Sequence, residues 1–241
     1  MKPTLAESLS TPEAKRRHVR RLFATIADRY DLITVVLSYG RDRAWKRRLV
    51  SMSGAGRATT ALDLACGTGD IAFAVAERGA RVVGLDVTLR MIELARAKRA
   101  ESSHSPAFLV GDMMALPFPD NAFDLITTGY GIRNVPRIEP ALAEIGRVLR
   151  PGGVLLSLDF NRPSNAAMRA IYLGYLTVVG SVVGWVLHRD PDTYRYIPES
   201  IRRYPGAGGV AAMLAREGFD ECRVIPLLGG LMAINTARRL R

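Results

Sequence analysis

A short apolar run that enters a glycine-rich turn constrains this chain more than any other feature. Residues 61–73 read ALDLACGTGDIAF, so a predicted strand leads through Gly67 and Gly69 directly into a predicted helix. Glycines in such a turn let the backbone approach a ligand closely, and the first N–H groups of the helix point into the same space. Asp86 ends the next predicted strand, where a carboxylate can bind both ribose hydroxyls of an adenosine cofactor. The pattern predicts a nucleotide-type cofactor site on a parallel sheet.

Strands and helices alternate regularly along the rest of the chain. We expect strands at 61–65, 81–86, 107–110, 123–128 and 154–160, and helices at about 70–78, 89–100 and 139–149, the last ended by a turn at 150–153. A helical insertion at about 164–205, a helix near 209–217 and two β-rich runs at 221–227 and 231–237 follow. Strands that alternate with helices in this way predict βαβ units and an α/β fold with a parallel sheet.

Two basic helices are predicted ahead of the sheet. Thr11 followed by Pro12 is a helix start signal, and apolar residues recur at helical spacing to about residue 28. A second helix is expected over about 42–52, followed by a glycine-containing linker at 53–56. We therefore expect residues 1–56 to form a helical cap over the active site and residues 57–241 to form the cofactor-binding domain.

The composition is that of an ordinary globular protein with a strong basic excess. Apolar residues make up 48% of the chain, which excludes a disordered protein, and the formal net charge is +11. That charge is compatible with nucleic acid or with an anionic membrane surface. Aromatic residues are only 7% and no nucleic-acid recognition motif is present, so no nucleic-acid partner is expected. Two cysteines without a Cys-x-x-Cys pair favour a cytoplasmic protein without a structural metal.

Three observations favour S-adenosylmethionine over a nicotinamide dinucleotide as the cofactor. Asp63 lies four positions before Gly67, where its carboxylate could meet the cationic amino end of the methionine moiety. Asp112 follows the third predicted strand, beside the expected place of the adenine. The Tyr-x-x-x-Lys pair of many hydride-transfer enzymes is absent from the sequence. The alternative, in which the glycines only form a turn and Asp86 only caps a helix, stays open.

The longer motifs resemble known families. ALDLACGTGD, GLDVT, GDMMALPFPDNAFD and RVLRPGG resemble the class I S-adenosylmethionine methyltransferase domain. The stretches at 28–46, 127–135, 158–163 and 192–205 are similar to the UbiE/MenG family of C-methyltransferases in menaquinone and ubiquinone biosynthesis. The likeness runs from about residue 13 to residue 236. It implies a Rossmann-like fold with a mostly parallel seven-stranded sheet, N-terminal helices and a helical insertion after the fifth strand.

The resemblance also implies an activity and a set of cofactor contacts. The implied reaction is S-adenosylmethionine-dependent C-methylation of a polyprenyl hydroquinone, either demethylmenaquinol or a methoxy-polyprenyl-benzoquinol. Thr68, Asp86 and the pair Asp112-Met113 are the implied cofactor contacts, and Gly129 stands where the family has a serine. The family often has Asn-Ala in place of Asp112-Met113, and Met-Asn in place of residues 33–34. These departures concern the fine cofactor contacts and the choice of quinone.

The substrate side of the site is predicted to lie just after the fourth strand. Methylation of a ring carbon requires a neighbouring hydroxyl to lose its proton, and such a phenol has a pKa of about 10. Our hypothesis is that Arg133 stabilises the phenolate and that Asn134 orients a ring oxygen; a structural ion pair is the alternative role for Arg133. Further candidates for lining the quinone are Tyr30, Asp31, Tyr196 and Arg202. The general base is not assigned; Asp70 and a bound water are the candidates that stay open.

Residues 170–187 contain no formal charge and are long enough to span a bilayer. The segment interrupts the predicted sheet domain, and a true span would separate two parts of one sheet. A wholly buried helix is one alternative. We favour a helix that walls an apolar slot and lays one face on the membrane, which together with the basic helix predicts peripheral contact with an anionic surface. We expect a cytoplasmic protein associated with the inner face of the membrane.

Two matters stay open in the sequence. A class I methyltransferase that acts on another lipid, a small molecule or RNA is the alternative to the quinol enzyme. The partner expected is the polyprenyl quinol substrate, and assembly into a homo-oligomer is left undecided.

Overall fold

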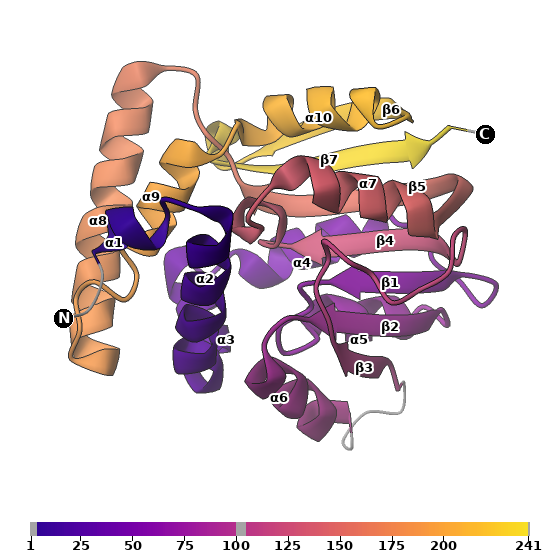
Figure 1. Cartoon of the computed structure of the whole chain (residues 1–241), viewed down its shortest axis with the longest axis horizontal. Helices are drawn as coiled ribbons and strands as arrows, with labels where there is room; N and C mark the ends of the chain where they lie inside the picture. Colours follow the sequence, from indigo (N-terminus) through magenta and orange to yellow (C-terminus); the bar gives the residue numbers. More distant parts are fainter. Residues whose placement is uncertain (1–3, 100–104, 241) are drawn as a thin grey trace.

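A seven-stranded sheet organises residues 4–99 and 105–240, the part of the chain that the computed structural model describes (Figure 1). The strand order is β3-β2-β1-β4-β5-β7-β6, in which β7 is antiparallel to both neighbours and the other pairs are parallel. The strands are β1 (Thr60–Leu64), β2 (Arg81–Asp86), β3 (Ala107–Val110), β4 (Phe123–Gly129), β5 (Leu149–Phe160), β6 (Phe219–Leu227) and β7 (Met232–Arg239). The predicted mostly parallel, seven-stranded α/β fold is confirmed.

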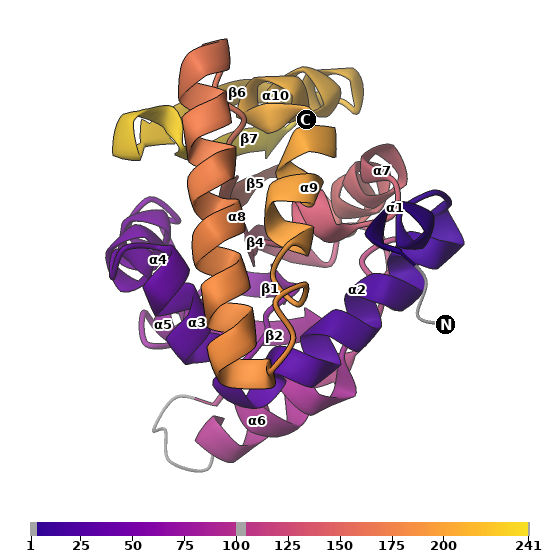
Figure 2. The same ribbon diagram turned by 90° about the vertical axis from the view of Figure 1, so that its left-hand side faces the viewer.

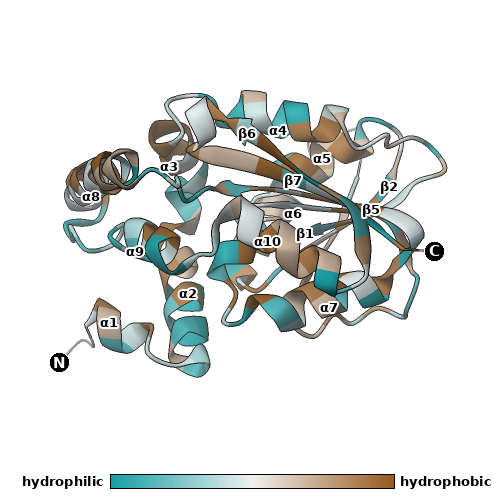
Figure 3. Cartoon of the chain, turned by 90° about the horizontal axis from the view of Figure 1, so that it is seen from above, coloured by the Kyte–Doolittle hydropathy of each residue, from teal (hydrophilic) through white to brown (hydrophobic). Residues whose placement is uncertain are grey.

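Helices cover both faces of the sheet (Figure 3). One face carries α4 (Asp42–Ser51), α5 (Asp70–Ala76) and α6 (Leu89–Arg99), and the other carries α7 (Ile138–Val148) and α10 (Gly206–Arg216). Side chains alternate between the two faces of a strand. Along β1, Ala61 belongs to the first core cluster, whereas Leu62 and Leu64 belong to the second.

A further helical layer crosses the carboxyl ends of the parallel strands (Figure 2). It contains α1 (Leu5–Ser8), α2 (Pro12–Ile26), α3 (Tyr30–Leu37), α8 (Ala166–His188) and α9 (Tyr196–Arg203). Three short 3₁₀ turns, η1 (Ala27–Arg29), η2 (Ile132–Asn134) and η3 (Leu228–Gly230), join the elements. The Thr11 hydroxyl accepts the Ala14 N–H at 3.2 Å, so the predicted start of α2 is confirmed.

The predicted turn at 150–153, which was expected to separate the helix from the fifth strand, is wrong. Leu149 is fully buried and pairs with Phe123, so β5 begins there and continues to Phe160. Gly152 has φ +79°, a backbone conformation that glycine adopts without steric cost. The register shift between Phe123 and Leu125 accommodates the irregular stretch within the strand pair. Burial of Leu149 therefore decides where the strand starts.

One face of the long apolar helix α8 packs on the protein, and the other face is exposed. It is the one helix in the described residues that is long and apolar enough to cross a membrane, yet only 28% of its most apolar window is buried. Its inner face packs closely, because a Cβ on Gly180 would lie 3.2 Å from Tyr194 and one on Gly184 would lie 2.5 Å from the Asp190 carbonyl. Because most of the apolar window is not buried, the alternative of a wholly buried helix is wrong.

Candidate active site

A cleft opens at the carboxyl ends of β1, β2, β3 and β4, beneath α2. It encloses about 700 Å³ of empty space, its open mouth included. We call it the main cleft; it is lined by Arg16, Val19, Arg20, Phe23, Tyr30, Ala65, Gly67, Leu85, Asp86, Val87, Thr88, Met91, Gly111, Asp112, Met113, Gly129, Tyr130, Gly131, Asn134, Val135 and Pro136. Crevices at this edge of a parallel sheet are the usual ligand sites of open α/β folds.

Asp86 is fixed in the main cleft by backbone donors. The N–H of Gly67 reaches one carboxylate oxygen at 3.0 Å, and the N–H of Thr88 reaches the other at 2.8 Å. Burial raises the pKa of Asp86, although these two hydrogen bonds oppose the shift. Gly67 has φ +54°, which suits a glycine at a tight turn. The arrangement holds a carboxylate with its remaining lone pairs toward the cleft, as a ribose requires.

Gly69 has a structural task in the same turn. Its φ is +91°, and a Cβ there would lie 2.9 Å from the rings of both Phe73 and Phe108. Gly69 is not in the lining of the main cleft. It allows α5 to pack closely on the sheet and thereby positions the turn.

The far end of the main cleft is closed by α2. Asp112 and Met113 both line it there, and the Asp112 carboxylate forms an ion pair with Arg16. The second oxygen of Asp112 accepts the Met114 N–H at 2.9 Å. The Asp112 carboxylate is therefore already engaged, and its adjoining backbone and Met113 supply the cleft surface.

Two glycines allow the chain to pack closely beside β4. A Cβ on Gly129 would lie 2.8 Å from Ile71, and one on Gly131 would lie 2.4 Å from the Thr128 hydroxyl. Tyr130 between them has φ +60°, an uncommon conformation for a residue with a side chain. The loop that follows β4 can therefore lie close to the glycine turn.

A smaller space, which we call the polar chamber, shares part of its wall with the main cleft. It is lined by Tyr30, Lys46, Asp63, Ala65, Cys66, Thr68, Asp70, Ile71, Gly129 and Tyr130. Asp63 accepts the Thr127 hydroxyl at 2.7 Å, and its other oxygen has no partner of normal geometry in the described part of the chain. Burial raises the pKa of Asp63 to about 7. This buried carboxylate can therefore receive a cationic group.

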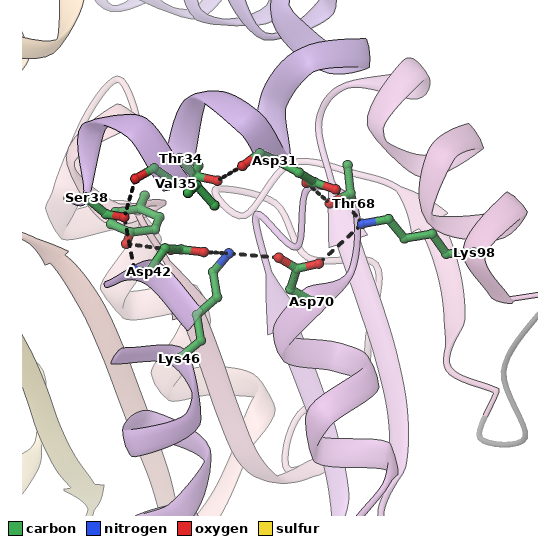
Figure 4. A network of polar contacts seen from close by, with 10 residues as sticks. Asp31, Thr34, Val35, Ser38, Asp42, Lys46, Thr68, Asp70 and Lys98 are labelled. Carbon is green, nitrogen blue, oxygen red and sulfur yellow. Dashed lines mark hydrogen bonds and ion pairs between the residues drawn. The ribbon is translucent and has the colours of Figure 1, made fainter. Parts of the chain in front are cut away.

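A hydrogen bond joins α3 to the glycine turn, and an ion pair joins α3 to α6 (Figure 4). Asp31 accepts the Thr68 hydroxyl and the Lys98 ammonium, both at 2.7 Å. Asp70 receives Lys98 at 3.3 Å and Lys46 at 3.0 Å. Although burial alone would raise it, these two lysines hold the pKa of Asp70 below its usual value. Asp31 thus orients Thr68 and lies outside the lining of both spaces.

A third space, the apolar slot, lies between α2, α3 and α9. It encloses about 540 Å³, open solvent included. Its lining is Leu22, Phe23, Ile26, Tyr30, Ile33, Thr34, Leu37, Ser38, Tyr130, Arg133, Phe160, Tyr194, Tyr196 and Ile197. The helix α8 packs behind it through Val179, Val183 and Leu187 and does not line it, which corrects the expectation that α8 forms its wall. Tyr30 and Tyr130 line all three spaces.

Arg133 and Asn134 are both buried and hydrogen-bonded. The guanidinium of Arg133 pairs with Asp159 and donates through Nε to Ser200 at 3.0 Å. Asn134 donates to the Tyr130 carbonyl at 2.7 Å and accepts the Tyr196 hydroxyl at 3.0 Å. The alternative of a structural ion pair for Arg133 is therefore present in the fold, and both residues still face a cavity.

Eleven of the predicted site residues line the three spaces, whereas Gly69, Asp31 and Arg202 line none of them. Tyr30, Gly67, Asp86, Asp112, Met113, Gly129 and Asn134 line the main cleft, Asp63 and Thr68 line the polar chamber, and Arg133 and Tyr196 line the apolar slot. Arg202 is exposed on α9 and pairs with Glu199, away from all three spaces. Lys46, Tyr130 and Asp159 were missed by sequence reasoning; only Tyr130, between two glycines, carried a local signal.

The residues present fit S-adenosylmethionine. The turn at Gly67 and the Asp86 carboxylate suit an adenosine, and the orphaned oxygen of Asp63 suits an ammonium group. Within residues 4–99 and 105–240, no three His, Cys, Asp or Glu side chains gather to hold a metal ion.

Known proteins are similar to this chain over nearly its whole length. The model of the ubiE/COQ5 methyltransferase family matches residues 11–239. A ubiquinone/menaquinone biosynthesis C-methyltransferase UbiE of Azotobacter vinelandii is 39% identical over 94% of this chain and 92% of its own. A demethylmenaquinone methyltransferase of Thermus thermophilus is 40% identical over 90% of this chain and 100% of its own.

Solved structures share the fold. A SAM-dependent methyltransferase of Thermotoga maritima, described as a possible histamine N-methyltransferase, has a TM-score of 0.68 and covers 92% of this chain and 99% of its own at 18% identity. The chain belongs to the ubiE/COQ5 methyltransferase family, and S-adenosylmethionine is its cofactor.

Proposed function

We propose that this chain transfers a methyl group from S-adenosylmethionine to a ring carbon of a polyprenyl hydroquinone. The observation that carries the proposal is that Tyr30 and Tyr130 line both the main cleft and the apolar slot, so the two spaces lie side by side. A slot lined by aliphatic and aromatic side chains suits a prenylated ring. The relatives are named as enzymes of ubiquinone and menaquinone biosynthesis, so demethylmenaquinol and a methoxy-polyprenyl-benzoquinol are the proposed substrates.

The chemistry assigned to the chain is activation of the quinol. The bound cofactor supplies an electrophilic methyl group. Arg133 lies in the slot wall, where its positive charge favours the ionised form of a ring hydroxyl. Although burial opposes the charge, Asp159 holds the pKa of Arg133 above its usual value, so the cation persists. The second N–H of the Asn134 amide, beyond the one given to Tyr130, is available to orient a ring oxygen.

We further propose that residues 1–56 cap this active site. Side chains of α2 and α3 supply a large part of the slot, and Arg16, Val19, Arg20 and Phe23 of α2 line the main cleft. The Lys15 ammonium donates to the Arg133 carbonyl at 3.1 Å, which ties α2 to the loop that follows β4. A cap of this kind excludes water from the place where the methyl group is transferred.

The outer face of α8 is the proposed contact with the membrane. Ile171 and Val178 are 75% and 64% exposed, and Val182, Trp185 and Val186, at helical spacing from them, are exposed as well. The basic helix α2 lies in the same helical layer (Figure 2). An apolar face combined with basic charge provides the two signals that peripheral attachment needs. The polyprenyl tail of the substrate would then reach the slot from the bilayer.

The experiment follows radiolabel from the methyl group of S-adenosylmethionine into an extractable quinol. We expect label in demethylmenaquinols or methoxy-benzoquinols, with a KM that falls as one and then two prenyl units are added, because the tail enters the slot. A head group without a tail that reacts equally well would contradict the slot. The absence of transfer to either ring class would contradict the function.

A further inference from the structure

Two buried tyrosines in the wall of the apolar slot differ in the partners of their hydroxyl groups. Tyr194 and Tyr196 are each 1% exposed, and both line the slot. The Tyr194 hydroxyl lies 2.9 Å from Nε2 of His188 on α8, whereas the Tyr196 hydroxyl lies 3.0 Å from Oδ1 of Asn134. Of the two, Tyr196 alone reaches a residue to which the proposed quinol chemistry assigns a task.

The Tyr196 hydroxyl is the donor in this contact. Burial raises the pKa of Tyr196, although the nearby Arg133 guanidinium opposes the shift, so the hydroxyl keeps its proton at neutral pH. The Asn134 oxygen carries no proton and can only accept. A tyrosine hydroxyl has a single proton to donate, and Tyr196 gives it to Asn134. Tyr196 therefore has no second O–H with which to bind a ring oxygen.

The Asn134 amide is held at both of its ends. Its Nδ2 donates to the Tyr130 carbonyl at 2.7 Å, and its Oδ1 accepts the Tyr196 hydroxyl. The same Tyr130 carbonyl lies 3.4 Å from Nη1 of Arg133, so this anchor is shared by both residues of the pair. With one anchor the amide could turn about the remaining hydrogen bond. With two, the direction of its second N–H is fixed.

Packing fixes the ring of Tyr196 before any substrate arrives. The ring belongs to a core cluster with Leu9 and Val19, and the ring of His18 on α2 lies 5.4 Å from it, centre to centre. The helices α9 and α2 are parts of the same helical layer (Figure 2). A donor that is already in place reduces the side-chain freedom that must be lost when the quinol binds.

We propose that Tyr196 is a positioning residue for methyl transfer, whose hydroxyl holds the Asn134 amide so that its second N–H meets a ring oxygen of the quinol. Tyr196 acts through Asn134 and transfers no proton itself. A donor that is turned away from the ring oxygen loses its hydrogen bond, and small displacements of this kind slow the chemical step. The inference rests on the proposed function, since it takes the quinol of that reaction as the partner of Asn134.

The competing interpretation is that the hydroxyl of Tyr196 only stabilises the fold. A stabilising hydrogen bond changes the free energy of unfolding and leaves the kcat of the folded protein as it was. A positioning hydrogen bond lowers kcat, and its effect disappears once Asn134 is gone. A double-mutant cycle between the two residues, read on kcat, separates these interpretations.

The test measures methyl transfer to a short-chain demethylmenaquinol and to a methoxy-benzoquinol with the whole protein and its variants. For Tyr196→Phe we expect kcat to fall about tenfold, with the affinity for S-adenosylhomocysteine unchanged within about twofold. Added to Asn134→Leu, the same substitution should change kcat by less than about twofold. Tyr172→Phe is the matched control, because Tyr172 is also buried and donates its hydroxyl to the Leu231 carbonyl at 3.2 Å, but lines none of the three spaces. It should leave kcat unchanged.

A second measurement covers the case in which Asn134→Leu does not fold or turns over too slowly. Tyr196→4-aminophenylalanine keeps the ring and places an N–H donor where the hydroxyl was, so kcat should return to within about threefold of the unaltered protein. An undiminished kcat in Tyr196→Phe would overturn the proposal, as would losses that add in the cycle or an amino variant no faster than Tyr196→Phe. If the unaltered protein methylates neither quinol, the proposed function itself fails.

Discussion

The guanidinium of Arg133 lies 2.6 Å from the carboxylate of Asp159, and both side chains are only 4% exposed. The other oxygen of Asp159 accepts the Arg133 N–H at 3.2 Å, and Arg133 Nε donates to Ser200 on α9. The guanidinium also lies 4.7 Å from the centre of the Phe160 ring. Arg133 therefore connects the loop after β4, the end of β5 and α9, and it faces the apolar slot at the same time.

This pair predicts that stability and catalysis can be separated. Arg133→Met leaves Asp159 buried without its cation, so we expect the free energy of unfolding to fall by about 3–5 kcal/mol and methyl transfer to be lost. The double variant Arg133→Met/Asp159→Leu should regain most of the stability but not the turnover. Denaturant unfolding and methyl-transfer assays measure the two quantities. Turnover restored in the double variant would show that Arg133 has a structural role only.

Asp86 is expected to dominate binding of the adenosine. Removal of a carboxylate that accepts ribose hydroxyls should cost about 1.5–3 kcal/mol, or roughly 10- to 100-fold in affinity. We expect this loss for S-adenosylhomocysteine in Asp86→Ala and a smaller one in Asp86→Asn, which keeps an oxygen acceptor for the Gly67 N–H. Calorimetry gives the affinities, and thermal unfolding checks the fold. An unchanged affinity in a folded Asp86→Ala protein would end the assignment.

Binding of the cofactor should depend on pH, because Asp63 is expected to accept a hydrogen bond from its amino end. Burial raises the pKa of Asp63 to about 7, so below that pH its carboxyl group must lose a proton before it can accept from an ammonium. The affinity for S-adenosylhomocysteine should therefore rise as the pH rises through about 7, with release of a proton on the acid side. Asp63→Asn is of the same size and does not titrate. If its pH profile equals that of the unaltered protein, Asp63 is not the titrating group.

Much of the fold could be predicted because its signals are local. The apolar run and glycine turn around Gly67 define β1 and α5, and the Thr11-Pro12 pair defines the start of α2. The four-residue α1 and the eight-residue α3 were not expected, since helices this short depend on tertiary packing. The early start of β5 depends likewise on the burial of Leu149, which no local pattern shows.

The same distinction between local signals and tertiary packing applies to the candidate site. Gly67 and Asp112 lie just after strands and Asp86 ends one, so the positions of these strands located all three residues. The partner of Arg133 could not be found in this way, because Asp159 is brought to it only by the pairing of β4 with β5. On α9 the helical period separates buried from exposed residues. Tyr196 and Ser200 are four residues apart on the buried face, whereas Arg202 is exposed and pairs with Glu199.

The outer face of α8 is expected to bind membranes in a salt-sensitive manner. The protein should sediment with anionic vesicles at low salt and be released at high salt, since screening weakens the basic contribution. The double variant Val182→Glu/Val186→Glu should lose most of this binding and keep its affinity for S-adenosylhomocysteine. Val224→Glu, on exposed β6, is the matched control. Extraction by detergent alone would favour a true span, and an unaffected double variant would contradict the proposed face.

The central claim is that the main cleft and the apolar slot join so that the methyl group reaches a ring carbon. The most direct measurement uses S-adenosylmethionine with a ¹³C-labelled methyl group, a short-chain demethylmenaquinol or methoxy-benzoquinol, and NMR of the extracted product. We predict that the label appears as a methyl group on a ring carbon of at least one of the two quinols. Label on a ring oxygen, or no labelled quinol from a protein that still binds S-adenosylhomocysteine, would contradict it.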